Sequence, residues 1–460
     1  MTMSRRRLLT SSAGAGLAIA VAGSVDALFT NASSANELGR RVGYGPLVPD
    51  PKGLLDLPRG FSYRVLSREG DALSGGAPVP SRFDGMGFFS KRGRPNALVR
   101  NHECRADAPI PVQAGPEHTY DPGSKGGTST LILDGASGLE REYPSLGGTA
   151  VNCAGGVTPW GTWLTCEETE DRAGTGTYTK DHGFIFEVDP YDQGRNTDPT
   201  PLGAMGRFAH EAICVDPKTG VVYETEDAFQ KPFGCYYRFH PNRPLGGHGS
   251  LRAGGKLEAM RVPGVADLSM VTEPGTVIGG IEWVEVPDPL ATTTPTRLQD
   301  YGPKGITHAQ KLEGAWWGDG GAYFVSSYAR VAEGSGAEHD GQVWRYDPKR
   351  NRLTLEVVFT RDQGAPADQL LQTPDNICVS PFGGLMIAED GDGENYVVGV
   401  SEDGEPYLFA NNRQNIGSDA EPEYSEFAGV VFSDDGSTLY VNCYRPGTTF
   451  AITGPWGKLQ

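Results

Sequence analysis

The stretch HEAICVDPKTGVVYETED (210–227) decides the fold. It contains two short apolar runs separated by a turn of the Asp-Pro-x-x-Gly kind, and polar or acidic residues flank it on both sides. Two β-rich runs around a turn that contains glycine predict an antiparallel β-hairpin. The hairpin would carry His210 and Glu211 at its start and Glu226 and Asp227 at its end.

The same pattern recurs along the chain. Five further copies are DGMGFFSKRGRPNALVRNHE (84–103), NCAGGVTPWGTWLTCEE (152–168), LEGAWWGDGGAYFVSSY (312–328), DNICVSPFGGLMIAEDG (375–391) and FAGVVFSDDGSTLYVNC (427–443). Other strand-like runs lie between these copies, for example at 183–190 and 341–348. Irregular repetition at roughly 50 to 100 residues is typical of propeller blades with insertions. The sequence therefore predicts an all-β protein, a six-bladed β-propeller with insertions between strands.

Residues 1–35 differ in composition from the rest of the chain. They have a basic start and a short Ala/Gly-rich middle, and the run SRRRLL (4–9) resembles a twin-arginine export signal. The alternative is an uncleaved membrane anchor, but the apolar part is short and rich in glycine. We expect an export signal at 1–35 and a single propeller domain at 36–460. The twin-arginine export machinery would deliver the folded protein to the periplasm, the cell surface or the medium, with no stable membrane insertion after processing.

Charge and cysteine content narrow the function classes. The net charge is −18, from 58 acidic and 40 basic residues, whereas a nucleic-acid interface needs a basic face. Nucleic acid is therefore not an expected partner. The excess carboxylates either form a solvated surface or bind divalent cations. The seven cysteines are an odd number, so at least one thiol stays outside any disulfide, and Cys153 is the candidate.

The ends of the hairpins carry the candidate chemistry. In an antiparallel hairpin the start of the first strand lies beside the end of the second. Three hairpins therefore bring together Cys153 with Glu167 and Glu168, His210 and Glu211 with Glu226 and Asp227, and Asp375 and Asn376 with Glu389 and Asp390. Radial repetition would gather these ends at one mouth of the central channel.

A ring of carboxylates at one mouth implies bound cations, because converging carboxylates repel one another. Oxygen ligands suit calcium, whereas a thiolate among them favours iron or zinc. His102 and His210, also at hairpin ends, are candidates for ligands or for partners of ligands. The alternative is a ring of exposed turn acids, with Cys153 packed inside a blade. The sequence contains no HExxH, GxxxxGK[ST] or GxSxG motif for other hydrolytic chemistries.

Several ordered motifs together resemble one known family. They are NCAGGVTPWGTWLTCEE (152–168), GRFAHE (206–211), YETED (223–227), TPDNI (373–377) and PGTTFAITGPW (446–456). In this order they resemble the PhoX-type alkaline phosphatases, with this chain as a short-form member. The resemblance spans about residues 45–457.

The resemblance implies a metal-dependent hydrolase of small-molecule phosphate esters, with an iron and calcium cluster at the mouth of the propeller channel. The iron ligands that it implies are Cys153, Glu211, Glu313 and Asp375. For calcium it points to the nearby oxygens of Glu103, Glu168, Glu226, Asp227 and Asp390. The catalytic set that it implies is Lys311, Cys153, Glu211 and Glu313.

Lys311 marks a departure from the family pattern. Longer members carry an arginine two residues before the glutamate that corresponds to Glu313. Lysine binds phosphate as a point charge but lacks the forked geometry of a guanidinium. The resemblance therefore leaves open whether the preferred ester is a monoester or a diester.

Two other functions share an acid-lined channel. A calcium-dependent lactonase-like hydrolase needs one metal and no thiolate ligand. A non-catalytic calcium-binding propeller would hold structural calcium without an open coordination position. The position of Cys153 relative to the carboxylates distinguishes these alternatives from the phosphatase.

Overall fold

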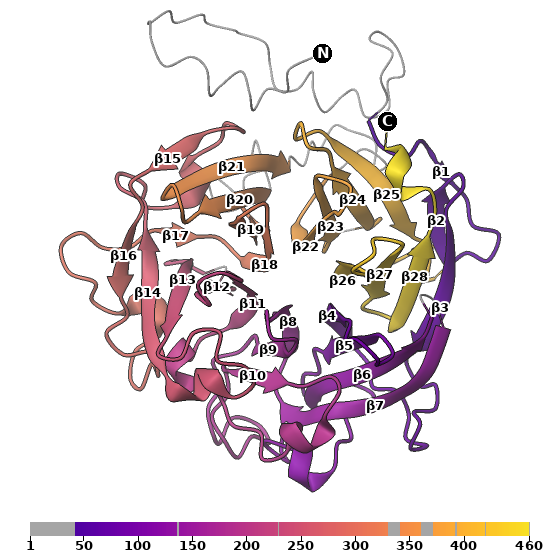
Figure 1. Ribbon diagram of the computed structural model, residues 1–460, viewed down its shortest axis with the longest axis horizontal. Coiled ribbons are helices and arrows are strands. Elements are labelled where there is room, and N and C mark those ends of the chain that lie inside the picture. The colour runs from indigo at the N-terminus through magenta and orange to yellow at the C-terminus, as the bar shows by residue number, and fades with distance from the viewer. Residues whose placement is uncertain are drawn as a thin grey trace, which may run out of the picture.

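The computed structural model describes residues 42–459 except 136–137, 229, 330–340, 360–370, 392 and 419. The predicted export signal at 1–35 lies outside the described residues. Six antiparallel sheets are arranged around a common centre (Figure 1). The prediction of an all-β, six-bladed propeller is confirmed.

Blades 1 to 3 follow one another along the chain. Blade 1 consists of β4 (Phe83–Phe89), β5 (Ala97–His102), β6 (Gly126–Asp134) and β7 (Gly138–Thr149). Blade 2 consists of β8 (Asn152–Val157), β9 (Trp163–Glu167) and β10 (Ile185–Val188). Blade 3 consists of β11 (His210–Val215), β12 (Val222–Glu226), β13 (Gly234–Pro241), β14 (Gly255–Arg261) and β16 (Glu282–Glu285), with β17 (His308–Ala309) paired to β13.

Blades 4 to 6 complete the ring. Blade 4 consists of β15 (Val277–Gly279), β18 (Leu312–Gly318), β19 (Gly321–Ser326), β20 (Gly341–Asp347) and β21 (Arg352–Phe359). Blade 5 consists of β1 (Leu47–Val48), β2 (Leu55–Pro58), β22 (Pro374–Val379), β23 (Leu385–Glu389), β24 (Tyr396–Val400) and β25 (Pro406–Asn412). Blade 6 consists of β3 (Ser62–Arg68), β26 (Phe427–Phe432), β27 (Thr438–Cys443) and β28 (Thr448–Thr453).

Strands from the two ends of the described chain close the ring. The early strand β3 pairs with β28, so that Val65 lies opposite Phe450. The neighbouring strand β2 pairs with β25 in blade 5, with Leu55 opposite Asn412. These pairings cover edges that blades 5 and 6 would otherwise expose, and they lock the last blades to the start of the propeller.

The six hairpins predicted from the sequence are formed by the two innermost strands of each blade, which are called its first and second strands below. They are β4–β5, β8–β9, β11–β12, β18–β19, β22–β23 and β26–β27. Their turns lie at one end of the ring. The strand starts and ends that carry the predicted chemistry therefore lie at the other end, which is called the mouth below.

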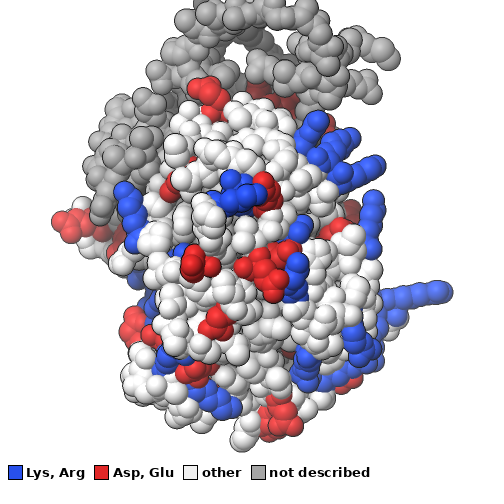
Figure 2. Space-filling model, turned by 90° about the vertical axis from the view of Figure 1, so that its left-hand side faces the viewer, with Lys and Arg blue, Asp and Glu red and all other residues white. Residues whose placement is uncertain are grey.

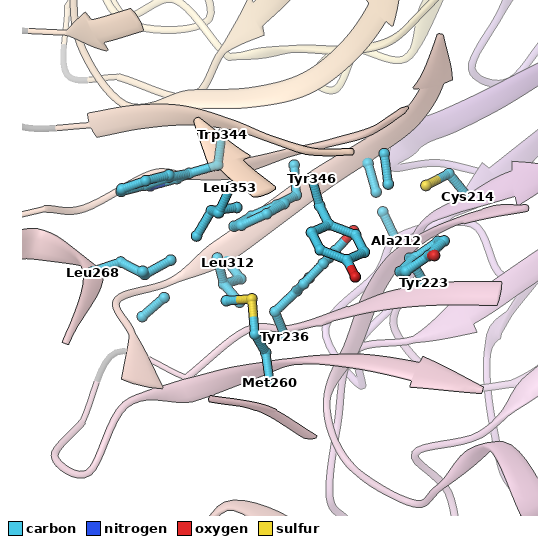
Figure 3. Packing of buried hydrophobic residues seen from close by; sticks show 14 of the residues in the cluster. Ala212, Cys214, Tyr223, Tyr236, Met260, Leu268, Leu312, Trp344, Tyr346 and Leu353 are labelled. Atoms are coloured by element: carbon cyan, nitrogen blue, oxygen red, sulfur yellow. The ribbon is translucent and has the colours of Figure 1, made fainter. Parts of the chain in front are cut away.

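Apolar side chains pack between neighbouring blades. Between blades 3 and 4 the rings of Tyr236 and Phe324 stack with centroids 4.0 Å apart. Tyr236, Trp344 and Leu353 belong to the same cluster and are fully buried (Figure 3). Burial of such apolar surface is the main favourable contribution to folding. The tightly packed blades form a rigid support for the residues at the mouth.

The helical segments in the described ranges are short 3-10 turns. They are η1 (Pro116–His118), η2 (Gln193–Asn196), η3 (Gly203–Met205), η4 (Ser250–Ala253), η5 (Leu268–Met270), η6 (Thr296–Leu298) and η8 (Trp456–Lys458). No helix in the described ranges has the length and hydropathy of a membrane span. All seven cysteines lie in these ranges and are free, as expected for Cys153.

One side of the propeller's outer face carries both signs of charge. Figure 2 views the side of the ring on which β14 and β16 lie, and it shows acidic and basic side chains next to one another. Glu282 of β16 pairs with Arg261 of β14 at 2.9 Å, and Glu258 of β14 pairs with Arg238 of β13 at 2.7 Å. At the mouth, in contrast, carboxylates from several blades gather.

Candidate metal centre

A β-bulge presents one side chain from each of five blades at the mouth. In each first hairpin the strand register shifts near the start of the first strand. A bulge takes residues out of the hydrogen-bonded ladder and re-aims their side chains. The second residue of the first strand, which begins the bulge in blades 1 to 5, is Asp84, Cys153, Glu211, Glu313 and Asp375. In blade 6 the second residue of β26 is Ala428, which has no ligand atom.

Two groups of potential ligands form from these residues. One consists of Cys153, Glu168 and Glu211, and the other of Glu211, Glu313 and Asp375, with one ligand atom from each residue lying within 4.8 Å of the others. The two groups share Glu211. The structure therefore brings together the four residues to which the family resemblance assigns iron.

The shared carboxylate is buried without a partner. Within the described ranges neither Oε1 nor Oε2 of Glu211 accepts a hydrogen bond. Burial, and then the charges of Glu313 and Asp375, raise the pKa of Glu211 well above its usual value. Burial also raises the pKa of Asp375 to about 7. Such a set of carboxylates is charged at neutral pH only when cations compensate it.

The thiol of Cys153 faces the same group. Burial, followed by the carboxylates of Asp84 and Glu211, raises the pKa of Cys153 well above that of a free cysteine. A thiol in these surroundings stays protonated unless a cation displaces its proton. Cys153 therefore has the environment of a metal ligand and not that of a free nucleophile.

A second set of acids lies where the second strands end. Glu103, Glu168, Asp227 and Asp390 are the residues that directly follow β5, β9, β12 and β23. Burial, and then the charges of Asp227 and Glu103, raise the pKa of Glu168 well above its usual value. Of the five residues nominated for calcium, Glu168 therefore belongs to the first ligand group, and Glu103, Asp227 and Asp390 lie at equivalent positions in other blades.

Glu226, the fifth nominee, lies elsewhere. Its carboxylate accepts hydrogen bonds from Tyr237 Oη at 2.7 Å, from the Cys235 backbone N–H at 3.0 Å and from Arg297 Nη1 at 2.9 Å. Successive residues of a strand point in opposite directions, so Glu226 turns away while Asp227 faces the mouth. The structure thus separates Glu226 from the ligand groups, and its carboxylate ties β12 to β13.

Glu167 has the same structural role in blade 2. Its Oε2 accepts the backbone N–H groups of Gly183 and Phe184, and its Oε1 lies 2.7 Å from His182 Nδ1. The other ring nitrogen of His182 lies 3.2 Å from Asp121 Oδ2. Burial alone would lower the pKa of His182, but hydrogen bonds to Glu167 and Asp121 raise it. This buried network holds the loop after Glu168 against the blade.

Two cationic side chains lie across the mouth from each other. Lys311 forms an ion pair with Glu313 of blade 4. Its Nζ also lies 3.9 Å from Asp227 Oδ2 of blade 3 and 4.0 Å from Asp390 Oδ2 of blade 5. Burial alone would lower the pKa of Lys311, but these carboxylates raise it well above its usual value. The other cation, Arg105, forms ion pairs with Glu103 of blade 1 and Glu168 of blade 2. The structure therefore places the predicted catalytic Lys311 within the acidic cluster.

Side chains from neighbouring blades hold the bulges in place. Asn442 Nδ2 donates to the carbonyl oxygen of Asp84 at 2.6 Å, and Asn101 Nδ2 donates to that of Cys153 at 3.1 Å. Thr225 Oγ1 donates in the same way to Glu313 O at 2.7 Å. Each donor lies on the second strand of the preceding blade. These bonds satisfy carbonyl groups that the bulges remove from the ladder.

The chain matches one protein family over nearly all of the described residues. The family is described as alkaline phosphatase PhoX, and the matched residues are 42–138 and 135–447. This chain belongs to the PhoX alkaline phosphatase family. The family resemblance stated from the sequence motifs is confirmed, and the family is one of phosphoric ester hydrolases. A search of curated proteins finds no match.

This chain is similar to several solved structures. Pseudomonas fluorescens PhoX in complex with vanadate, a transition state analogue, superposes with a TM-score of 0.64 and 17% identity, covering 91% of this chain and 98% of that chain. The gluconolactonase XC5397 of Xanthomonas campestris has a TM-score of 0.42 and 13% identity, covering 91% of this chain and 99% of that one. The PQQ domain of Coprinopsis cinerea pyranose dehydrogenase has a TM-score of 0.44 and 12% identity, covering 88% of this chain and 98% of that one.

Two acids of the PhoX-family mouth escaped the sequence analysis. Burial, and then Glu103, Asp375 and Glu426, raise the pKa of Asp84 well above its usual value. Glu426 lies directly before β26. Burial, and then the charge of Asp390, raise the pKa of Glu426 well above its usual value. Asp84 begins the loosest of the six hairpin copies, so its position could have revealed it. Glu426 has no such signal, because Lys311 stands at the matching position in blade 4.

The two candidate histidines do not enter the ligand groups. His102 Nδ1 lies 2.9 Å from Ser81 O, and its Nε2 lies 2.8 Å from Ser129 Oγ. His210 Nδ1 lies 3.5 Å from Glu224 Oε2, and both side chains are fully buried. The histidines therefore support the strands that carry Glu103 and Glu211.

Proposed function

We propose that this PhoX-family protein hydrolyses phosphate esters at the mouth of the propeller with bound iron and calcium. The observation that carries the proposal is the pair of ligand groups that share Glu211, one of which includes the thiol of Cys153. A thiol and several carboxylates together suit one softer transition metal and one or more hard cations. Membership of a family of phosphoric ester hydrolases supports the reaction class.

The residues at the mouth fit such a cluster. Iron would be held by Cys153, Glu211, Glu313 and Asp375, and calcium by Glu103, Glu168, Asp227 and Asp390, with Asp84 and Glu426 as additional oxygen ligands. The partnerless oxygens of Glu211 support this assignment, because buried carboxylates without hydrogen bonds are costly unless a cation binds them. When bound, the cations would act as Lewis acids and offset the charge of the phosphoryl group.

Lys311 has the position of a substrate contact. A phosphate ester is an anion, and a chain of net charge −18 repels it unless the local field is positive. The Lys311 ammonium is paired with Glu313, and cations on Glu313, Asp227 and Asp390 would leave its N–H groups for a phosphoryl oxygen. The vanadate complex of Pseudomonas fluorescens PhoX supports a phosphoryl-transfer site on this fold.

The alternatives account less well for the thiol. A single-calcium lactonase-like site has no use for Cys153 beside Glu168 and Glu211. A non-catalytic calcium-binding propeller requires no cationic Lys311 among the carboxylates. The phosphatase uses both groups, and for this reason we favour it.

The same proposal includes export. The basic start and the SRRRLL run of residues 4–9 support transport by the twin-arginine machinery, which carries folded proteins. Cells producing the protein with Arg5 and Arg6 both changed to Lys should retain it in the cytoplasm. Equal amounts of this variant and the wild-type protein outside the cytoplasm would contradict the export route.

An assay of the purified protein tests the proposed activity. Protein isolated without chelator is analysed for iron and calcium, and then assayed with p-nitrophenyl phosphate before and after treatment with a chelator. We expect both metals and hydrolysis that the chelator abolishes. Glu211→Gln should lose bound metal and activity together. Metal-free wild-type protein with full activity, or metal-loaded protein with none, would contradict the proposal.

A further inference from the structure

We propose that Arg105 contacts the phosphoryl group of the substrate from the side of the mouth opposite Lys311. This inference rests on the proposed phosphatase function and adds a second cationic residue to it. Arg105 lies in the segment after β5 and belongs to none of the motifs that carry the family resemblance. The structure alone brings it to the site.

The contacts of Arg105 place it at the edge of the first ligand group. Its Nη2 lies 2.7 Å from Glu103 Oε1 and 3.0 Å from Glu168 Oε2. Glu168 belongs to the same group as Cys153 and Glu211. The Arg105 side chain is 54% exposed, whereas those of its two partners are 11% and 15% exposed. The guanidinium therefore lies between the buried ligands and the solvent from which a substrate arrives.

Arg105 has unused capacity to bind an anion. Both contacts come from a single nitrogen, Nη2, whereas a guanidinium carries five N–H donors in a planar fork. When cations occupy Glu103 and Glu168, these carboxylates attract the guanidinium less strongly. A phosphoryl group with two free oxygens matches the guanidinium fork in geometry and charge.

Lys311 and Arg105 would hold the substrate from two sides. Lys311 contacts carboxylates of blades 3, 4 and 5, and Arg105 contacts carboxylates of blades 1 and 2. Lysine supplies a point charge, whereas arginine can supply two parallel hydrogen bonds. Arg105 would thus provide, from another blade, the forked contact that Lys311 lacks.

The competing role for Arg105 is that of a counter-ion only. In that role it would neutralise Glu103 and Glu168 and have no contact with substrate. The two roles differ in one measurable quantity, the affinity of the metal-loaded protein for inorganic phosphate. A counter-ion contributes to the stability of the protein and leaves phosphate affinity unchanged.

The experiment compares Arg105→Ala and Arg105→Lys with the wild type at equal metal content. The dissociation constant of inorganic phosphate is measured by calorimetry, and KM and kcat are measured with p-nitrophenyl phosphate. Arg92→Ala, at an exposed position in the turn between β4 and β5, is the matched control. We expect Arg105→Ala to weaken phosphate binding by about tenfold to a hundredfold, equivalent to roughly 1.4 to 2.7 kcal/mol. Arg105→Lys should recover part of this loss, and so should added guanidine with Arg105→Ala.

The outcomes separate this inference from the proposed function. If the wild type hydrolyses the ester and Arg105→Ala binds phosphate as tightly as the wild type, the role of Arg105 is overturned and the phosphatase stands. A lower unfolding temperature of Arg105→Ala with unchanged phosphate affinity would identify Arg105 as a counter-ion and would also overturn its role as a substrate contact. If metal-loaded wild type neither binds phosphate nor hydrolyses the ester, the proposed function itself fails.

Discussion

The thiol Sγ of Cys153 lies 3.7 Å from Oδ2 of Asp84, although the two residues belong to different blades. Both occupy the second position of a first strand, where a bulge takes them out of the ladder. The contact joins blade 1 to the group formed by Cys153, Glu168 and Glu211. Asp84 is therefore positioned to act together with Cys153 on a bound cation.

Asp84→Asn should weaken metal binding at the Cys153 group. The substitution keeps the shape of the side chain and removes one negative charge near the cation. We expect metal affinity to fall by about tenfold to a hundredfold, as for other groups that support a metal site. The measurement is metal content after dialysis against graded chelator concentrations. Asp403→Asn, in an exposed turn between β24 and β25, is the control, and equal metal retention in both variants would contradict the role of Asp84.

Gly314→Ala should disturb the second ligand group through the backbone. A Cβ atom at Gly314 would lie 2.7 Å from the carbonyl oxygen of Asp375 and 2.8 Å from Asn376 Cα. Because both atoms belong to the backbone, β18 and β22 must move apart, which separates Glu313 from Asp375. We expect a loss of about 1 to 3 kcal/mol in the free energy of unfolding, together with weaker metal binding.

Urea unfolding and metal analysis of Gly314→Ala test this expectation. Gly75→Ala is the control, because no atom lies within 4 Å of the added Cβ there. Two variants of equal stability and equal metal content would show that the close approach of β18 to β22 has no bearing on the site.

Asn101→Ala should loosen the bulge that carries Cys153. Asn101 Nδ2 donates to the carbonyl oxygens of Cys153 at 3.1 Å and Ala154 at 2.6 Å, and its Oδ1 accepts from Trp163 Nε1 at 2.9 Å. Leaving buried polar groups without partners costs about 1 to 3 kcal/mol each. The loss should be measurable by denaturant unfolding of chelator-treated protein, in which metal binding makes no contribution. Unchanged stability under those conditions would refute the support assigned to Asn101.

His182→Gln should change the pH dependence of stability. The folded-state pKa of His182 is raised, so its stabilising contribution is full below the unfolded value of about 6.5 and is lost as pH rises through the folded-state value. Glutamine is neutral at every pH. The wild type should therefore exceed the variant by about 2 kcal/mol near pH 6 and by less at alkaline pH. Unfolding free energies at pH 6 and pH 9 measure the difference, and a gap that widens toward alkaline pH would contradict the charge assigned to His182.

The hairpin pattern was sufficient to predict the propeller and its blade count. Two apolar runs around a glycine-containing turn are a local signal, and each copy could be read by itself, as 210–227 shows. The closure of the ring by β2 and β3 was not predicted. Their pairing with β25 and β28 spans most of the chain, and no local pattern specifies such a partner.

The candidate site was predicted only in part, because the hairpin pattern is local and does not specify every contact at the mouth. Cys153, Glu211 and Asp375 stand at equivalent hairpin positions, so the pattern placed them together. Glu226 was grouped with Asp227 because both end one strand, but the alternation of side chains along a strand sends them in opposite directions. Arg105 escaped because it lies outside the hairpins and reaches the mouth only through the three-dimensional arrangement.

Anomalous X-ray diffraction from crystals of the exported protein, grown without chelator, tests the central claim most directly. Data collected on both sides of the iron absorption edge, and at a wavelength where calcium scatters anomalously, locate each metal independently of its assumed ligands. We predict iron bound by Cys153 and Glu211 at the mouth, with calcium among the surrounding carboxylates. Crystals of an active protein with no metal at the mouth, or with metals only at the outer edges of the blades, would contradict the account.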